Sequence, residues 1–158
     1  EMRSGKEELV RRVLLENYEI YYRLAFSYVH QEAGAMDIVQ EGAYRAMLKA
    51  DTLREESFAG TWVYRIMINE AKEYLRKNSR EYAVPDENLP AAEAYRDPDL
   101  REALQGLPEA ERTLIILRYF EDKQLSEIAE ILQENVNTVK SRLYRTLSKL
   151  REQLSVST

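Results

Sequence analysis

The 158-residue sequence contains no cysteine and only one histidine, and these two shortages exclude several kinds of chemistry. Without cysteine there is no disulfide, no thiolate zinc site and no cysteine nucleophile. The single imidazole, that of His30, leaves no histidine pair to hold a metal ion. We therefore expect a protein with no metal site and no cofactor.

Long hydrophobic runs are also missing. No stretch approaches the roughly 18 consecutive apolar residues that a membrane span requires, and the chain does not open with the charged, apolar and small-residue succession of an export signal. Apolar residues make up 44% of the sequence and charged residues 32%, which suits one ordinary core or two small ones. We expect a soluble, cytoplasmic, globular protein with no direct membrane insertion.

Acidic residues outnumber basic ones by 28 to 23, and the excess lies in the middle of the chain. Residues 81–107 hold three of the four prolines and show no sustained helical or strand period. We interpret residues 81–99 as a flexible acidic linker between two domains, residues 1–80 and residues 100–158. The linker is either a solvated tether or a transient mask for a basic surface.

On both sides of this linker, apolar residues recur every three or four positions, which predicts an all-α fold of two small helical domains. Glycine and polar breaks divide the first domain into helices near 7–30, 35–50 and 58–77. In the second domain, Pro98 and Pro108 each stand at the start of a helix, and two further helices follow.

The last two helices have the form of a helix-turn-helix. Ser126 is the expected cap of the first of them, and Gln133 stands in the turn, at a left-handed position that glycine usually takes. A side chain there costs about 1 kcal/mol. The second helix begins with Val136, which the helical wheel places on the apolar side, and it extends beyond Arg151.

This final helix carries five basic residues and no acidic one between Val136 and Arg151. A carboxylate on its polar face would oppose phosphate binding, whereas Arg, Asn and Ser side chains can contact both phosphates and base edges. The pattern predicts a DNA-recognition helix. The alternative interpretation is a solvated basic face on an ordinary helix pair.

A second surface lies on the helix predicted at residues 58–77. One of its faces combines aromatic, amide and cationic side chains, namely Trp62, Arg65, Asn69, Lys72 and Arg76. Aromatic planes stack on unpaired bases and cations follow the phosphate backbone, so this mixture suits an opened strand better than a closed duplex. A tryptophan near a helix start is also a common core anchor, and that interpretation of Trp62 remains open.

A third surface is formed by Asp37, Gln40 and Glu41, which share one polar face of a helix. Two carboxylates without a nearby histidine, cysteine or third acid lack the partners of a nuclease or metal site, so we reject that function. A protein-docking patch or a solvated face remains. Gly42 lies within the same helix, where glycine costs about 1 kcal/mol relative to alanine.

Three segments together resemble a bacterial sigma factor of the extracytoplasmic-function (ECF) group of the sigma-70 family. They are DIVQEGAYRAML from Asp37, SFAGTWVYRIMINEAKEYLRK from Ser57, and SEIAEILQENVNTVKSRLYRTLSKLRE from Ser126. The resemblance implies a non-catalytic initiation subunit that binds core RNA polymerase, recognises the -10 and -35 promoter elements and helps to open the duplex. It also implies an anti-sigma protein that covers both DNA-binding domains.

The resemblance also implies roles for individual residues. Those for docking to core polymerase are Asp37, Gln40 and Glu41. Those for the opened strand at -10 are Leu53, Glu55, Ser57, Phe58, Trp62, Tyr64, Arg65, Asn69, Lys72 and Arg76. Those for the duplex at -35 are Asn137, Thr138, Lys140, Ser141, Arg142, Tyr144 and Arg145.

A stand-alone helix-turn-helix transcriptional regulator is the alternative function. Such a protein would account for the basic helix after Val136 but not for the mixed face around Trp62. It would bind a palindromic duplex alone, with half-sites one helical turn apart, whereas a sigma factor would bind asymmetric promoters mainly together with core polymerase.

Overall fold

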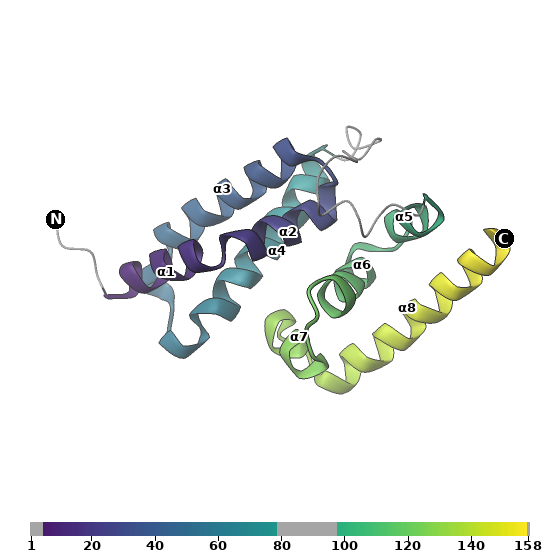
Figure 1. Ribbon diagram of the computed structural model, residues 1–158. Coiled ribbons are helices and arrows are strands. Elements are labelled where there is room, and N and C mark those ends of the chain that lie inside the picture. The colour runs from purple at the N-terminus through teal and green to yellow at the C-terminus, as the bar shows by residue number, and fades with distance from the viewer. Residues whose placement is uncertain (1–4, 79–97, 158) are drawn as a thin grey trace. The chain divides into compact units, whose positions relative to one another are not determined.

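The computed structural model describes residues 5–78 and 98–157, and all regular structure in these ranges is helical (Figure 1). The predicted all-α fold is therefore confirmed. The chain divides into two compact units, residues 1–86 and 87–158. Most of the predicted linker lies outside the described residues, and its last two residues begin a helix. None of the described helices is long and apolar enough to cross a membrane.

Four helices and two short 3-10 turns form the first unit. They are α1 (Gly5–Glu16), α2 (Tyr18–Val29), α3 (Glu32–Leu48), the turns Ala50–Thr52 and Glu56–Phe58, and α4 (Ala59–Asn78). Helices α2, α3 and α4 pack around a shared core, to which each contributes a fully buried side chain: Leu24, Ile38 and Met67. Tyr21 and Tyr64 meet edge to face across the same core, with ring centroids 5.9 Å apart.

The single helix predicted at residues 7–30 is divided into α1 and α2. Asn17 lies between them with φ -117° and ψ 19°, outside the helical region. Helical backbone hydrogen bonds nevertheless continue through this residue, because the Asn17 N–H donates to the Val13 carbonyl at 3.1 Å and the Tyr21 N–H donates to the Asn17 carbonyl at 3.0 Å. The side-chain Nδ2 of Asn17 also donates to the Val13 carbonyl at 2.9 Å, and a side-chain bond of this kind favours a local distortion of the helix.

Gly42 allows α3 and α4 to approach each other closely. A Cβ atom added at this buried position would collide with the Sδ atom of Met67. The helix-propensity cost of this glycine is therefore accompanied by a packing benefit that the sequence does not reveal. The close approach fixes the two helices that carry the first unit's candidate surfaces.

We expect Gly42→Ala to destabilise the protein by about 1–2 kcal/mol, because overpacking costs more than the roughly 1 kcal/mol of helix propensity that alanine gains. Gly60→Ala is the matched control, since nothing lies within 4 Å of a Cβ atom added to Gly60 near the start of α4. The control should be neutral or stabilising. Urea unfolding of both variants measures the difference, and equal stabilisation of both would contradict the packing role of Gly42.

The described part of the second unit, residues 98–157, contains four helices, as predicted. They are α5 (Pro98–Gln105), α6 (Glu109–Ile115) with a π-helical turn Ile116–Phe120 at its end, α7 (Leu125–Leu132) and α8 (Val136–Ser157). Fully buried Leu114, Ile128 and Val139 come from α6, α7 and α8. Their packing holds α8 against the rest of the unit, so that its opposite side faces outward.

The turn between α7 and α8 is fixed by backbone geometry. Gln133 has φ 56° and ψ 46°, which confirms the left-handed position. The N–H of Glu134 donates to the Ala129 carbonyl at 2.9 Å, in the pattern of a Schellman motif. The Asn135 side chain then accepts the N–H of Asn137 at 2.7 Å and caps α8. The predicted helix-turn-helix is therefore present, with a well-defined turn.

Two details of this motif differ from prediction. Gln124, not Ser126, precedes the first turn of α7, and its N–H donates at 3.1 Å to the Glu127 carboxylate, which replaces a serine cap. Val136 is 43% exposed because α8 begins there, before the helix reaches the core. Thr146, farther along α8, is fully buried, and its hydroxyl donates to the Arg142 carbonyl at 2.8 Å.

Candidate nucleic-acid and partner interfaces

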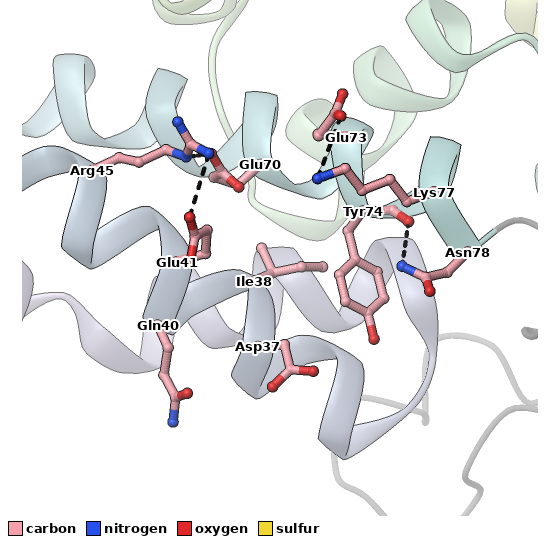
Figure 2. Close-up of a pocket in the computed structure, with 10 residues that line it drawn as sticks. All are labelled: Asp37, Ile38, Gln40, Glu41, Arg45, Glu70, Glu73, Tyr74, Lys77 and Asn78. Atoms are coloured by element: carbon pink, nitrogen blue, oxygen red, sulfur yellow. Dashed lines mark hydrogen bonds and ion pairs between the residues drawn. The ribbon is translucent and has the colours of Figure 1, made fainter.

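A groove of about 420 Å³ lies between α3 and α4, and the three predicted docking residues form part of its lining (Figure 2). All three are exposed. Four carboxylates and two cations line the groove: Asp37, Glu41, Glu70 and Glu73, with Arg45 and Lys77. The groove is therefore acidic on balance and suits a basic partner surface.

Arg45 links the two walls of this groove. Its Nη2 lies 3.3 Å from the Glu41 carboxylate on α3, and its Nε forms an ion pair with Glu70 on α4. Burial raises the pKa of the Glu70 carboxyl, and the Arg45 guanidinium partly offsets that effect. Figure 2 shows Glu41 turned toward Arg45, whereas Gln40 extends away from it. Glu41 is thus engaged within the protein.

The sequence-based prediction missed the α4 wall of the groove. Glu70, Glu73 and Lys77 recur there at spacings of three and four, which is the only signal the sequence carries. Because the contact between α3 and α4 is tertiary, that spacing alone does not place these residues beside Asp37. The predicted docking residues therefore form one edge of a two-helix groove rather than an isolated helix face.

On α4, the predicted mixed face lies on the side away from the core. Asn69 and Arg76 are exposed, and Trp62, Arg65 and Lys72 are half-buried. Since the indole of Trp62 is not fully enclosed, it is not simply a core anchor. The face presents an aromatic edge, an amide and cations along one stripe of the helix, as an opened strand would require.

Arg76, at the far end of this face, is already paired. Its Nε donates to the Glu73 carboxylate at 3.1 Å, and this hydrogen bond lowers the pKa of Glu73. Lys77 lies 3.8 Å from the same carboxylate. A nucleic-acid phosphate at this end would have to compete with Glu73, so the cationic character of the stripe is weakest here.

Two residues predicted for the -10 strand do not fit it. Leu53 is 3% exposed and Tyr64 is 5% exposed, so both side chains belong to the core of the first unit. Tyr64 is two positions after Trp62, which turns it 200° around the helix and away from the mixed face. Leu53 holds the loop before α4 against the core, while Ser57 and Phe58 in the same loop are exposed, as is the predicted Glu55.

The polar face of α8 is available for binding. Six of its predicted residues are exposed: Asn137, Thr138, Lys140, Ser141, Tyr144 and Arg145. Arg142 is half-buried at the side of this face, and buried Val139 and Leu143 mark the core side. The Lys140 ammonium lies 5.9 Å from the centre of the Tyr144 ring. The exposed surface offers amide, hydroxyl, aromatic and cationic groups together, a set suited to both phosphates and bases.

Acidic residues from outside the recognition helix neutralise two of its cations. Both carboxylate oxygens of Glu134, in the turn, lie 3.0 Å from Nη1 of Arg142. The Lys149 ammonium lies 2.7 Å and 3.0 Å from the two oxygens of Glu111 on α6. The surface of α8 is therefore less positive than its sequence alone suggests.

Within the two described ranges, no group of three or more His, Asp or Glu side chains is arranged to hold a metal ion. Asp37 and Glu41 share the groove, but Glu41 is paired with Arg45. This arrangement gives no support to a nuclease, because a metal-dependent nuclease needs carboxylates free to ligate the metal.

Family models match both units. A model described as Sigma-70 region 2 covers residues 13–81, and a model described as Sigma-70, region 4 covers residues 98–150. The chain is 43% identical to the RNA polymerase sigma factor SigV of Bacillus subtilis, over 90% of this chain and 89% of that protein. It is 33% identical to the ECF RNA polymerase sigma factor SigW of the same organism, over 87% and 82%.

Two solved structures also resemble this chain. The sigma factor RpoE from Bartonella quintana, crystallised with the anti-sigma factor NepR, matches with a TM-score of 0.71 and 25% identity, covering 94% of this chain and 98% of that one. CnrH, solved with the cytosolic domain of CnrY, matches at 0.70 with 18% identity, which supports the fold alone. Two region models, relatives matched over most of their length and a helix-turn-helix in the second unit agree: the chain belongs to the sigma-70 family of transcription initiation factors, in its ECF group.

Proposed function

We propose that this sigma factor binds core RNA polymerase through the α3–α4 groove, reads an opened -10 strand with the mixed face of α4 and reads a -35 duplex with α8. The observation that supports the proposal is that one chain exposes two surfaces of different chemistry, one on α4 and one on α8. The first has stacking and amide groups suited to unpaired bases, and the second is a recognition helix suited to a groove. The chain itself performs no covalent chemistry.

Individual residues are assigned to these surfaces according to the exposure of their side chains. The proposed docking residues are Asp37 and Gln40, with Glu41 as part of the groove's internal ion network. The proposed -10 residues are Glu55, Ser57, Phe58, Trp62, Arg65, Asn69, Lys72 and Arg76. The proposed -35 residues are Asn137, Thr138, Lys140, Ser141, Arg142, Tyr144 and Arg145. The buried side chains of Leu53 and Tyr64 support these surfaces from the core.

Regulation by an anti-sigma protein is part of the proposal. The related RpoE structure contains a sigma factor bound to an anti-sigma factor, and the similarity spans nearly the whole of both sigma chains. The acidic groove and the partly neutralised basic helix give such a protein two chemically different surfaces to cover. Since its targets would be polymerase and promoter DNA, we place the action of this chain in the bacterial cytoplasm.

A comparison of DNA binding with and without core polymerase tests the proposal against a stand-alone regulator. Purified chain, alone and in complex with core polymerase, is incubated with genomic duplex fragments, and bound fragments are sequenced. Asymmetric sites that appear only with polymerase support the sigma function. Enrichment of palindromic sites by the chain alone would instead establish the regulator.

We expect Arg145→Ala to weaken promoter binding by the complex of chain and polymerase, because Arg145 is exposed on α8 and forms no ion pair within the described residues. A base contact costs roughly 1–3 kcal/mol at one position, and a phosphate contact lowers the salt slope by about one. Arg151→Ala, farther along the same helix and also exposed, is the matched control. Equal effects of the two substitutions on affinity and salt dependence would contradict a specific role for Arg145.

A further inference from the structure

Glu134, in the turn before α8, places a carboxylate beside the predicted DNA-binding surface, where acidic side chains ordinarily oppose phosphate binding. It follows the left-handed Gln133, and its N–H is tied to the Ala129 carbonyl at 2.9 Å, so its backbone is fixed by the turn. Its side chain reaches forward to Arg142, two turns along α8, with both oxygens 3.0 Å from Nη1. The side chains of Glu134 and Arg142 are only 31% and 24% exposed.

The geometry of this pair leaves most of the guanidinium available. Both carboxylate oxygens meet the same nitrogen, whereas a fork-to-fork pair would occupy two nitrogens. Within the described residues, Nε and Nη2 of Arg142 form no hydrogen bond or ion pair and can donate elsewhere. The carboxylate fixes one corner of the guanidinium and leaves its other edge free.

The position of Arg142 on α8 determines where the free edge of its guanidinium points. Arg142 lies at the side of the exposed face, one turn after Thr138 and three residues before Arg145. Because Glu134 precedes the helix, the ion pair directs the arginine side chain toward the N-terminal end of α8. In a helix-turn-helix, this end of the recognition helix contacts the base edges.

We propose that Glu134 is a positioning residue for -35 recognition: its carboxylate orients the Arg142 guanidinium so that the free edge meets one base or phosphate of the promoter. This inference rests on the proposed function. Orientation before binding spares a long side chain the loss of rotamer freedom on binding, and so favours the correct site. The negative charge simultaneously weakens attraction to every other phosphate. Both effects increase discrimination, at the expense of non-specific affinity.

The test uses the complete chain in complex with core polymerase and a duplex library randomised across the -35 region. Two quantities are measured: enrichment of the preferred sequence over the pool, and affinity for an unrelated duplex. We expect Glu134→Gln to raise the non-specific affinity a few-fold while lowering discrimination by about tenfold, the effect of losing one oriented arginine contact. Arg142→Lys keeps the positive charge without the fork, so it should lower discrimination and leave the non-specific affinity nearly unchanged.

Glu152→Gln is the control, because it removes the same charge from an exposed position farther along α8. It should leave discrimination unchanged. Raised non-specific affinity with unchanged discrimination in Glu134→Gln would show that Glu134 only repels phosphate, and would overturn the inference. A fall in both quantities together with a lower melting temperature would make Glu134 a brace for the turn, which also overturns it. If the parent complex selects no sequence at -35, the proposed function fails instead.

Discussion

Asp37→Arg combined with Gln40→Arg should abolish stable association with core RNA polymerase while the chain remains folded. Both side chains are exposed at the edge of an acidic groove, and neither takes part in the ion network of Glu41, Arg45 and Glu70. Two new cations facing a basic partner would cost several kcal/mol, or roughly a hundredfold or more in affinity. The free energy of unfolding should change by less than about 0.5 kcal/mol. Fluorescence titration of labelled chain with core polymerase measures the loss.

This variant retains Glu41. An arginine at position 41 would face Arg45, so that a loss of binding could arise from a disturbed groove rather than a lost contact. Glu16→Arg, at the exposed end of α1, makes a charge change of the same sign outside the groove and should bind normally. If the folded double variant binds polymerase as tightly as this control, α3 is not the docking helix.

The second large effect is expected at Asn69. On the proposed function, Asn69→Ala should impair promoter opening far more than promoter binding, because α8 would still tether the duplex while α4 would lose a group proposed to engage unpaired bases. Asn69 is exposed, so its loss leaves the core intact, whereas Trp62 is half-buried and its removal would also disturb packing. A contact to a flipped or unstacked base is worth roughly 1–3 kcal/mol, which corresponds to about 5- to 150-fold in the extent of opening.

Permanganate reactivity of thymines in the -10 region measures this opening directly. The variant should recover activity on a template with a preformed mismatch bubble, since the bubble removes the cost of unpairing. Gln105→Ala, which removes an exposed amide from α5 in the other unit, is the control. If the Asn69→Ala variant opens linear duplex promoters as well as the control does, Asn69 has no role in melting. If the Arg65→Ala variant also does so, α4 does not form the -10 surface.

Periodicity was sufficient to predict the all-α fold and the helix-turn-helix, because both depend on local patterns and capping. The left-handed Gln133 also follows from position within the motif. The interruption at Asn17 was not predicted, because the apolar period continues through it and only the backbone angles of this one residue leave the helical region. The burial of Tyr64 was accessible from the sequence, since a helical wheel already separates it from Trp62; only the family resemblance suggested otherwise.

The ion pairs could not be predicted from the sequence, for a different reason. Arg45 joins Glu41 to Glu70 across two helices, and Glu134 reaches Arg142 across the turn. The helix free of acidic residues between 136 and 151 was correctly identified as the second helix of a helix-turn-helix, but acids from outside it were not anticipated. Such contacts depend on how helices pack and on which rotamers result, and neither is specified by the spacing of charges along the chain.

The most direct test of the central claim is transcription from linear genomic duplexes by core polymerase, with and without this chain. Start sites are mapped by sequencing the transcripts. Addition of the chain should produce initiation at a defined set of positions, preceded by shared motifs near -10 and -35, and the Asp37→Arg, Gln40→Arg variant should not produce it. Unchanged transcription after addition of folded chain, with no new start sites, would contradict the account.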